Sequence, residues 1–64
     1  MDASEKHILE MLNRDARDTA DRLGAFLNRN KNVIPSLVYA HVSLAETAAR
    51  NASAELRNAR NLIP

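Results

Sequence analysis

The sequence predicts an all-α protein, an antiparallel two-helix hairpin, and three observations lead to this prediction. The 64 residues include only one glycine and two prolines, while alanine, leucine, arginine and glutamate, which favour helices, are frequent. Apolar residues recur every three or four positions in both halves of the chain. The polar segment 28–32 between the halves is short, so two helices joined by it must run antiparallel.

The first helix is expected over about residues 3–28. Asp2 and Glu5 have the spacing of a capping box and place acidic groups at the positive end of the helix. The expected core-facing stripe consists of Leu9, Leu12, Ala16, Thr19, Leu23 and Phe26, widened by Ile8, Ala20 and Leu27. Ion pairs four residues apart are expected on the outer face: Glu10–Arg14, Arg14–Asp18, Arg17–Asp21 and Asp18–Arg22.

Gly24 interrupts this pattern. A glycine inside a helix costs about 1 kcal/mol relative to alanine. We therefore expect either close packing at this position or a locally soft helix.

The loop is expected over about residues 29–34. The run 28–32 alternates asparagine with basic residues, and asparagine tolerates the left-handed conformation that often ends a helix. Pro35 suits the first turn of the next helix, where an amide donor is not needed.

The second helix is expected over about residues 35–62, and one apolar ladder runs along it without a polar interruption. Its eight positions are Val38, Val42, Ala45, Ala49, Ala52, Leu56, Ala59 and Ile63. This 3.5-residue repeat is typical of a seam that packs along its whole length on another helix. Half of the ladder is alanine, so the packing partner must approach closely or have bulky side chains.

Residues 1–64 form a single domain at most, and a chain of this length buries little surface when it folds alone. It has no cysteine, which excludes disulfides and thiolate metal sites, and its two histidines are far apart in sequence. Self-association is the remaining way for such a short chain to bury enough surface to be stable. We therefore expect a four-helix bundle dimer or a higher symmetric oligomer.

Two groups of residues are candidate binding sites. The first is an apolar strip beside the ladder, which would face a partner or another subunit, or else lie under the first helix: Leu37, Tyr39, His41 and Leu44. The second is basic and would bind an anion or a nucleic acid, or else be a solvated face: Arg29, Lys31, Arg50, Arg57 and Arg60. Nucleic acid is the less favoured ligand, because aromatic residues for base stacking are almost absent.

No catalytic, metal or cofactor site is predicted. The sequence has no Ser-His-acid or Cys-His arrangement, no metal-spaced cluster and no glycine-rich phosphate loop. No apolar run approaches the length of a membrane span, and the N-terminal residues lack the pattern of a signal peptide. An enzyme and a membrane protein are therefore not expected, and the expected location is the cytoplasm.

The expected function is that of a small non-enzymatic binding or inhibitory module. It would act as an oligomer, through helix-face contact with a protein or by sequestering a small anionic ligand. Two alternatives remain: an RNA-binding regulator that uses the basic helix face, and a structural oligomerisation domain of a longer chain.

Overall fold

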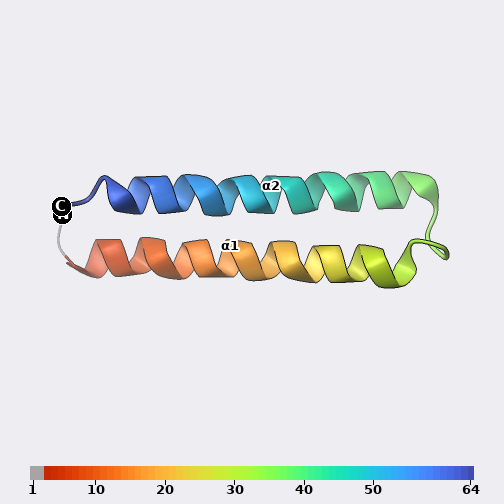
Figure 1. Ribbon diagram of the computed structural model, residues 1–64, viewed down its shortest axis with the longest axis horizontal. Coiled ribbons are helices and arrows are strands. Elements are labelled where there is room, and N and C mark those ends of the chain that lie inside the picture. Colours follow the sequence, from red (N-terminus) through yellow and green to blue (C-terminus); the bar gives the residue numbers. More distant parts are fainter. Residues whose placement is uncertain (1–2) are drawn as a thin grey trace.

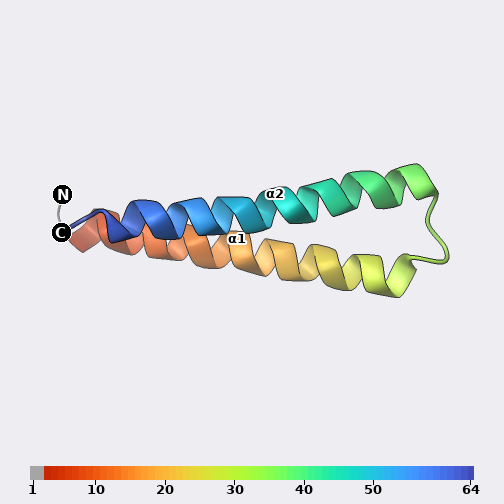
Figure 2. The ribbon, with the colours of Figure 1, turned by 45° about the horizontal axis from the view of Figure 1, so that its top comes forward.

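The computed structural model describes residues 3–64 as two antiparallel helices that pack against each other (Figure 1). Helix α1 spans Ala3–Asn30 and helix α2 spans Ser36–Asn61. The hairpin measures 47 × 14 × 10 Å between Cα atoms. A turned view shows that the helices are inclined to each other rather than parallel (Figure 2). The predicted all-α hairpin is confirmed, while the capping role of Asp2 lies outside the described residues.

The turn between the helices is closed by Asn30, the last residue of α1. Its side-chain amide donates to the Phe26 carbonyl at 2.9 Å, and its own carbonyl accepts from the amides of Val33 at 2.9 Å and Ile34 at 3.1 Å. No non-glycine residue among those described has a positive φ. The expected left-handed asparagine is therefore wrong, because the right-handed turn already satisfies these terminal carbonyl groups.

Pro35 lies one position before α2 rather than inside its first turn. Its φ of −58° and ψ of 149° are those of an extended residue. Its carbonyl accepts the first hydrogen bond of the helix, from the Tyr39 amide at 3.0 Å. Proline is tolerated here because the position requires no amide donor.

The core between the helices is thin. Among the described residues only Ala20 and Leu27 are buried apolar side chains, and no large side chain is fully buried. The positions of α1 that face α2 are Leu9, Asn13, Ala16, Ala20, Leu23 and Leu27. Those of α2 that face α1 are Val42, Glu46, Ala49, Ser53, Leu56 and Arg60, followed by Ile63 just after the helix.

This seam differs from the ladder expected on α2. Four ladder positions lie in it half-buried, namely Val42, Ala49, Leu56 and Ile63, whereas Val38, Ala45, Ala52 and Ala59 are exposed. On α1, likewise, Leu12, Thr19 and Phe26 are exposed. Within the hairpin, α1 therefore covers four of the eight ladder positions and leaves the other four exposed. Polar side chains from both helices occupy one side of the seam, and both apolar stripes turn toward the other side.

Candidate binding surfaces

The hairpin has one apolar side, to which both helices contribute. We define the apolar face as Leu12, Thr19 and Phe26 of α1 with Val38, Ala45, Ala52 and Ala59 of α2. These residues occupy the same flank of the seam, because corresponding flanking positions of antiparallel helices lie together. Leu12, Phe26 and Val38 are 46%, 41% and 42% exposed. Thr19 is the one polar member, and no described residue of the chain covers the large apolar side chains of this face.

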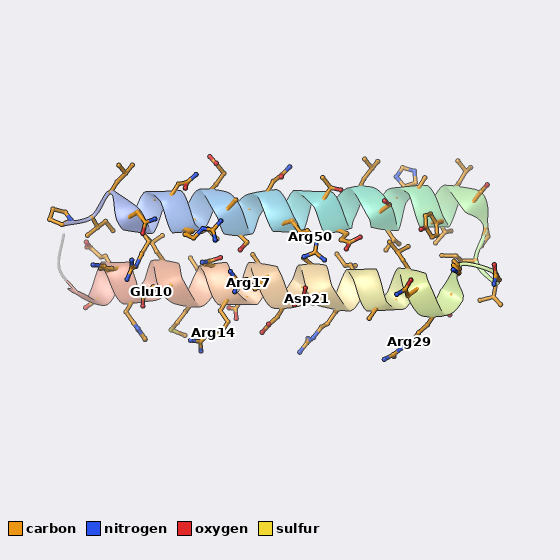
Figure 3. The ribbon with its side chains drawn as sticks, viewed as in Figure 1. Glu10, Arg14, Arg17, Asp21, Arg29 and Arg50 are labelled. Carbon is orange, nitrogen blue, oxygen red and sulfur yellow. The ribbon has the colours of Figure 1, made fainter. Side chains whose placement is uncertain are left out.

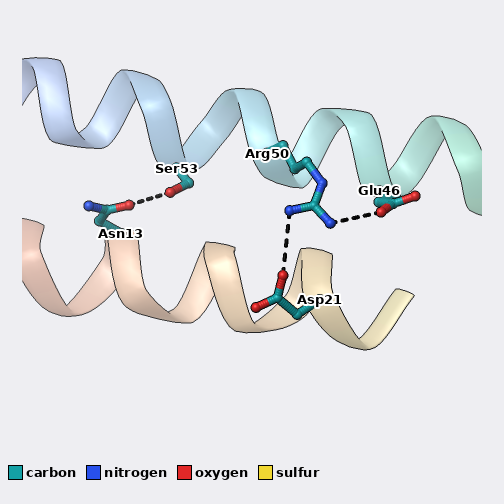
Figure 4. Close-up of polar contacts among 5 residues, drawn as sticks. All are labelled: Asn13, Asp21, Glu46, Arg50 and Ser53. Carbon is teal, nitrogen blue, oxygen red and sulfur yellow. Dashed lines mark hydrogen bonds and ion pairs between the residues drawn. The ribbon is translucent and has the colours of Figure 1, made fainter. Parts of the chain in front are cut away.

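We call the opposite side of the seam the polar face; it includes Arg17, Asp21, Glu46, Arg50 and Arg57. Arg50 links the two helices there. Its guanidinium donates to Glu46 on the same helix at 2.9 Å and to Asp21 of α1 at 3.4 Å (Figure 4). The hydrogen bond to Glu46 is the main cause of the raised pKa of Arg50; desolvation opposes it, and the charge of Glu46 and the contact with Asp21 add to the rise. The Arg50 cation therefore ties the two helices together.

Gly24 makes room for the Glu46 carboxylate. A Cβ atom at this position would lie 2.8 Å from Glu46 Oε2, closer than real Cβ atoms approach. The close packing that the sequence suggested at Gly24 is thus an approach of a carboxylate from α2.

A second ion pair joins the free ends of the hairpin. The Arg60 Nε atom donates to Glu10 Oε1 at 2.7 Å. This hydrogen bond holds the pKa of the Glu10 carboxyl below its ordinary value of 4.5. Since both side chains are exposed, the pair fixes the relative position of the helices more than it adds stability.

The Ser53 hydroxyl donates to the Asn13 side-chain oxygen in the seam between these two ion pairs (Figure 4). Ser53 is only 8% exposed and Asn13 is half-buried. A buried polar group that finds its partner in only one register disfavours sliding of the two helices. This bond therefore specifies the register of the hairpin.

The ion pairs expected within α1 do not form. Arg14, Arg17, Asp18 and Arg22 have no ion pair in the hairpin, and Asp21 pairs with α2 instead. Arg14 points away from α2 (Figure 3). Ion pairs between the helices form in place of the ion pairs expected along α1, because Arg50 and Arg60 of α2 reach the acidic groups of α1.

The polar face also contains two guanidinium groups that remain without a carboxylate. Arg17 and Arg57 line a shallow hollow of about 140 Å³, together with Arg50, Ser53 and Ala54. Neither side chain forms an ion pair within the described chain. Arg17 was not among the basic residues singled out from the sequence, because Asp21, four residues later, looked like its partner.

The five predicted basic residues do not form one site. Arg50 and Arg57 come together, but Arg50 is already paired, and Arg60 is paired with Glu10. Arg29 points away from α2 (Figure 3), and Lys31 lies in the turn beside Ile34 and Tyr39.

The predicted apolar strip is also divided. Tyr39 lines an open cleft of about 420 Å³ with Gly24 and Leu27 of α1. Leu37 and Leu44, 74% and 66% exposed, lie about 200° and 140° around the helix from Tyr39. His41 is exposed between them. We define Leu37, His41 and Leu44 as the outer strip of α2.

Within residues 3–64, no three His, Asp or Glu side chains are placed to hold a metal ion together. Neither described helix is long and apolar enough to cross a membrane.

No protein-family model, curated protein or solved structure matches this chain. The inferences about function therefore rest on the surfaces described above.

Proposed function

We propose that the protein is a non-enzymatic binding module that acts through helix faces and works as a dimer of hairpins in a four-helix bundle. The observation that carries the proposal is the exposed apolar face. Surfaces of this kind on a small protein are typical of protein interaction sites. We expect the module to act in the cytoplasm, since a chain without cysteine suits a reducing compartment.

The direction of the apolar stripes supports a bundle of four helices. On each helix the stripe lies about 60° from the line toward the other helix, given 100° for each residue. In a bundle of four helices, each helix directs its stripe at the common axis, which lies between its two neighbours. Both helices of this hairpin direct their stripes to the same open side, where the second pair of helices would complete the core.

The exposed area supports the same assembly. The hairpin exposes 4887 Å², whereas a compact globular protein of 7.1 kDa exposes about 4100 Å². The excess is close to the roughly 800 Å² that each partner buries in a standard stable interface. The excess exposed area of one copy is thus about the area that one subunit buries in a stable dimer interface.

The outer strip is our candidate surface for a protein partner of the dimer. Leu37 and Leu44 lie on the side of α2 away from α1, about 100° around the helix from Val38 and Ala45 and at the same margin as Glu55, so self-association would leave them partly accessible. Leu37, His41 and Leu44 follow the spacing by which one helix face docks into an apolar groove. An inhibitory module would act by covering a partner through this strip.

A second candidate function is the binding of an anionic ligand at the hollow between Arg17 and Arg57. The observation in its favour is that these two guanidinium groups line one hollow and lack carboxylates. Guanidinium groups bind phosphate and carboxylate oxygens well. A nucleic acid would bind here mainly through phosphates, and its affinity would fall steeply with salt.

The dimer is tested with two matched variants by sedimentation equilibrium at micromolar concentrations. Leu12→Glu places a charge on the apolar face, and Leu44→Glu places the same charge on the outer strip. We expect a dimer for the parent and for Leu44→Glu, and a monomer for Leu12→Glu. A parent protein that is folded and monomeric would overturn the proposal.

The same variants separate partner binding from self-association. We expect Leu44→Glu to abolish capture of a protein partner while the dimer persists. If Leu44→Glu retains the full biological activity and Leu12→Glu does not, oligomerisation itself is the function. If Arg17→Ala with Arg57→Ala removes the activity instead, the anionic ligand replaces the protein partner.

A further inference from the structure

The apolar face fits a second copy of the chain in one orientation, an inference that rests on the proposed dimer. Two-fold symmetry allows two arrangements of face-to-face hairpins. With the axis along the helices, both turns lie at the same end and α1 packs on the partner subunit's α2. With the axis across the helices, the turns lie at opposite ends, and each helix packs on its own copy.

The charges at the margin of the apolar face distinguish these arrangements. Asp15 and Arg22 of α1 lie at this margin, both exposed and neither in an ion pair within the hairpin. They lie on either side of Thr19 along the helix. When two copies of α1 run antiparallel about Thr19, Asp15 lies beside the partner subunit's Arg22, and the same pair forms again by symmetry.

The apolar residues of α1 fit the same orientation. Antiparallel pairing about Thr19 places Leu12 beside the partner subunit's Phe26, so the two largest side chains of the face cover each other. Thr19 then meets the partner subunit's Thr19 at the axis. The one polar member of the face thus gains a hydroxyl group as a hydrogen-bond partner.

The arrangement with both turns at one end sets like charges together. The Glu10–Arg60 and Asp21–Arg50 contacts show which residues of the two helices lie at the same level. By these two contacts Asp15 is level with Glu55, and by the Asn13–Ser53 contact it lies about one helical turn from that level. Glu55 is exposed at the corresponding margin of α2, so the two carboxylates would be neighbours across the interface. Like charges at such a position disfavour the arrangement.

The ladder of α2 supports the same axis independently. Its eight positions, Val38 to Ile63, are centred between Arg50 and Asn51, so antiparallel copies pair Ala49 with the partner subunit's Ala52. Asp15 and Arg22 are centred between Asp18 and Thr19. Along the hairpin, both midpoints lie between the Asn13–Ser53 contact and the Asp21–Arg50 contact, so they are at about the same position along its length. One two-fold axis therefore serves both helices.

We infer that the chain forms a dimer with its turns at opposite ends, in which α1 packs on α1 about Thr19 and α2 packs on α2 through the alanine-rich ladder. The eight-position ladder thereby serves as an interface between two copies of one helix. The polar faces, with Arg17 and Arg57, lie on the two outer sides of the dimer.

Single cysteines test this orientation, since the chain has none of its own. In the inferred dimer Thr19→Cys lies at the axis, close enough to its copy for a disulfide. We expect this variant to form a covalent dimer in a glutathione buffer, at least tenfold more than Leu44→Cys, whose thiol would lie about 20 Å along α2 from its own copy. A mass-tagged mixture of Thr19→Cys and Ala52→Cys should give no mixed disulfide above that control level.

Charge exchange provides a second measurement. Asp15→Arg and Arg22→Asp should each weaken the dimer about fivefold, because each removes two exposed ion pairs. The double variant Asp15→Arg with Arg22→Asp should restore the parent dissociation constant, which a merely structural effect of either change would not do. Glu55→Arg should leave that constant unchanged.

The outcomes separate this inference from the proposed dimer. A parent that sediments as a monomer refutes the dimer itself. A dimer that forms mixed Thr19→Cys and Ala52→Cys disulfides, and that Glu55→Arg strengthens, has both turns at one end. That result overturns the inferred orientation and leaves the proposed association intact.

Discussion

Single residues of the polar face set the distance and register between the helices. Gly24 admits the Glu46 carboxylate, Arg50 then links this carboxylate to Asp21, and Ser53 binds Asn13 within the seam. These contacts use small or polar side chains where a two-helix core would ordinarily use large apolar ones. Three further large apolar side chains, Leu12, Phe26 and Val38, lie exposed on the other side.

Replacing Gly24 with alanine is expected to stabilise the hairpin slightly. Alanine contributes about 1 kcal/mol of helix propensity. The new Cβ atom displaces the Glu46 carboxylate, which lies at the end of a flexible side chain, and the exposed pair with Arg50 is worth less than that gain. The free energy of unfolding in urea should rise by about 0.5 kcal/mol.

The control for this substitution is Gly24→Ala in a Glu46→Ala background, where the full gain of about 1 kcal/mol should appear. A loss of stability in the parent background would mean that Glu46 cannot move aside.

Acid should weaken the contact between Glu10 and Arg60. The hydrogen bond from Arg60 lowers the pKa of Glu10 in the folded chain, so its stabilising effect is present above the ordinary value of 4.5. It is lost as the pH falls through the lower pKa of the folded state. In thermal melts from about pH 7 to pH 3, the difference in Tm between the parent and Arg60→Ala should shrink below pH 4.5.

Arg57→Ala is the matched control, because Arg57 has no ion pair in the described chain. Its difference in Tm from the parent should not vary with pH over the same range. An equal pH dependence for both variants would mean that net charge, and not the Glu10–Arg60 contact, produces the effect.

At the scale of the helices, the sequence predicts well which residues are helical. It predicts poorly how each helix is rotated about its own axis, and hence which face it turns to the other helix. Helical periodicity and the polar segment are local signals, and they lead to two helices, a turn and an antiparallel path. The apolar ladder of α2 is equally clear, but a ladder does not say which helix covers it. In the hairpin α1 covers only Val42, Ala49, Leu56 and Ile63 of this ladder.

The candidate sites were predictable only in part, for a related reason. The i,i+4 spacing predicts an ion pair between Arg17 and Asp21. It predicts no partner on α1 for Arg50 or Arg60. In the hairpin, Arg50 reaches Asp21 and Arg60 reaches Glu10. Which charges remain without a partner depends on the register between the helices, and the Asn13–Ser53 bond that fixes this register gives no signal in the sequence.

Two alanines of the ladder should now respond differently to enlargement. Ala49 is half-buried in the seam near the buried Ala20, so Ala49→Leu forces α1 and α2 apart at a cost of about 1–3 kcal/mol. Ala52 is exposed in the hairpin, and Ala52→Leu should weaken only the association of two hairpins. Circular dichroism and sedimentation at several protein concentrations separate these effects. Equal loss of helix for both variants at low concentration would place Ala52 inside the seam.

At the scale of the whole molecule, folding and association should be one process. The seam of a single hairpin buries few apolar side chains. In the proposed dimer the apolar face would supply the rest of the core. A domain of this kind resembles half of a four-helix protein, so its stability should depend on protein concentration.

The melting temperature should therefore rise with concentration. Each tenfold increase adds about 1.4 kcal/mol to the stability of a dimer, and two chains of 64 residues unfold with an entropy that converts this into roughly 5 °C. Leu44→Glu should show the same slope, since its side chain lies at the exposed margin of the proposed interface, as that of Glu55 does. Leu12→Glu should melt lower, at a temperature that does not vary with concentration. A parent Tm that is constant from about 1 to 100 μM would show that the thin core of one hairpin is sufficient, and that the apolar face binds something other than its own copy.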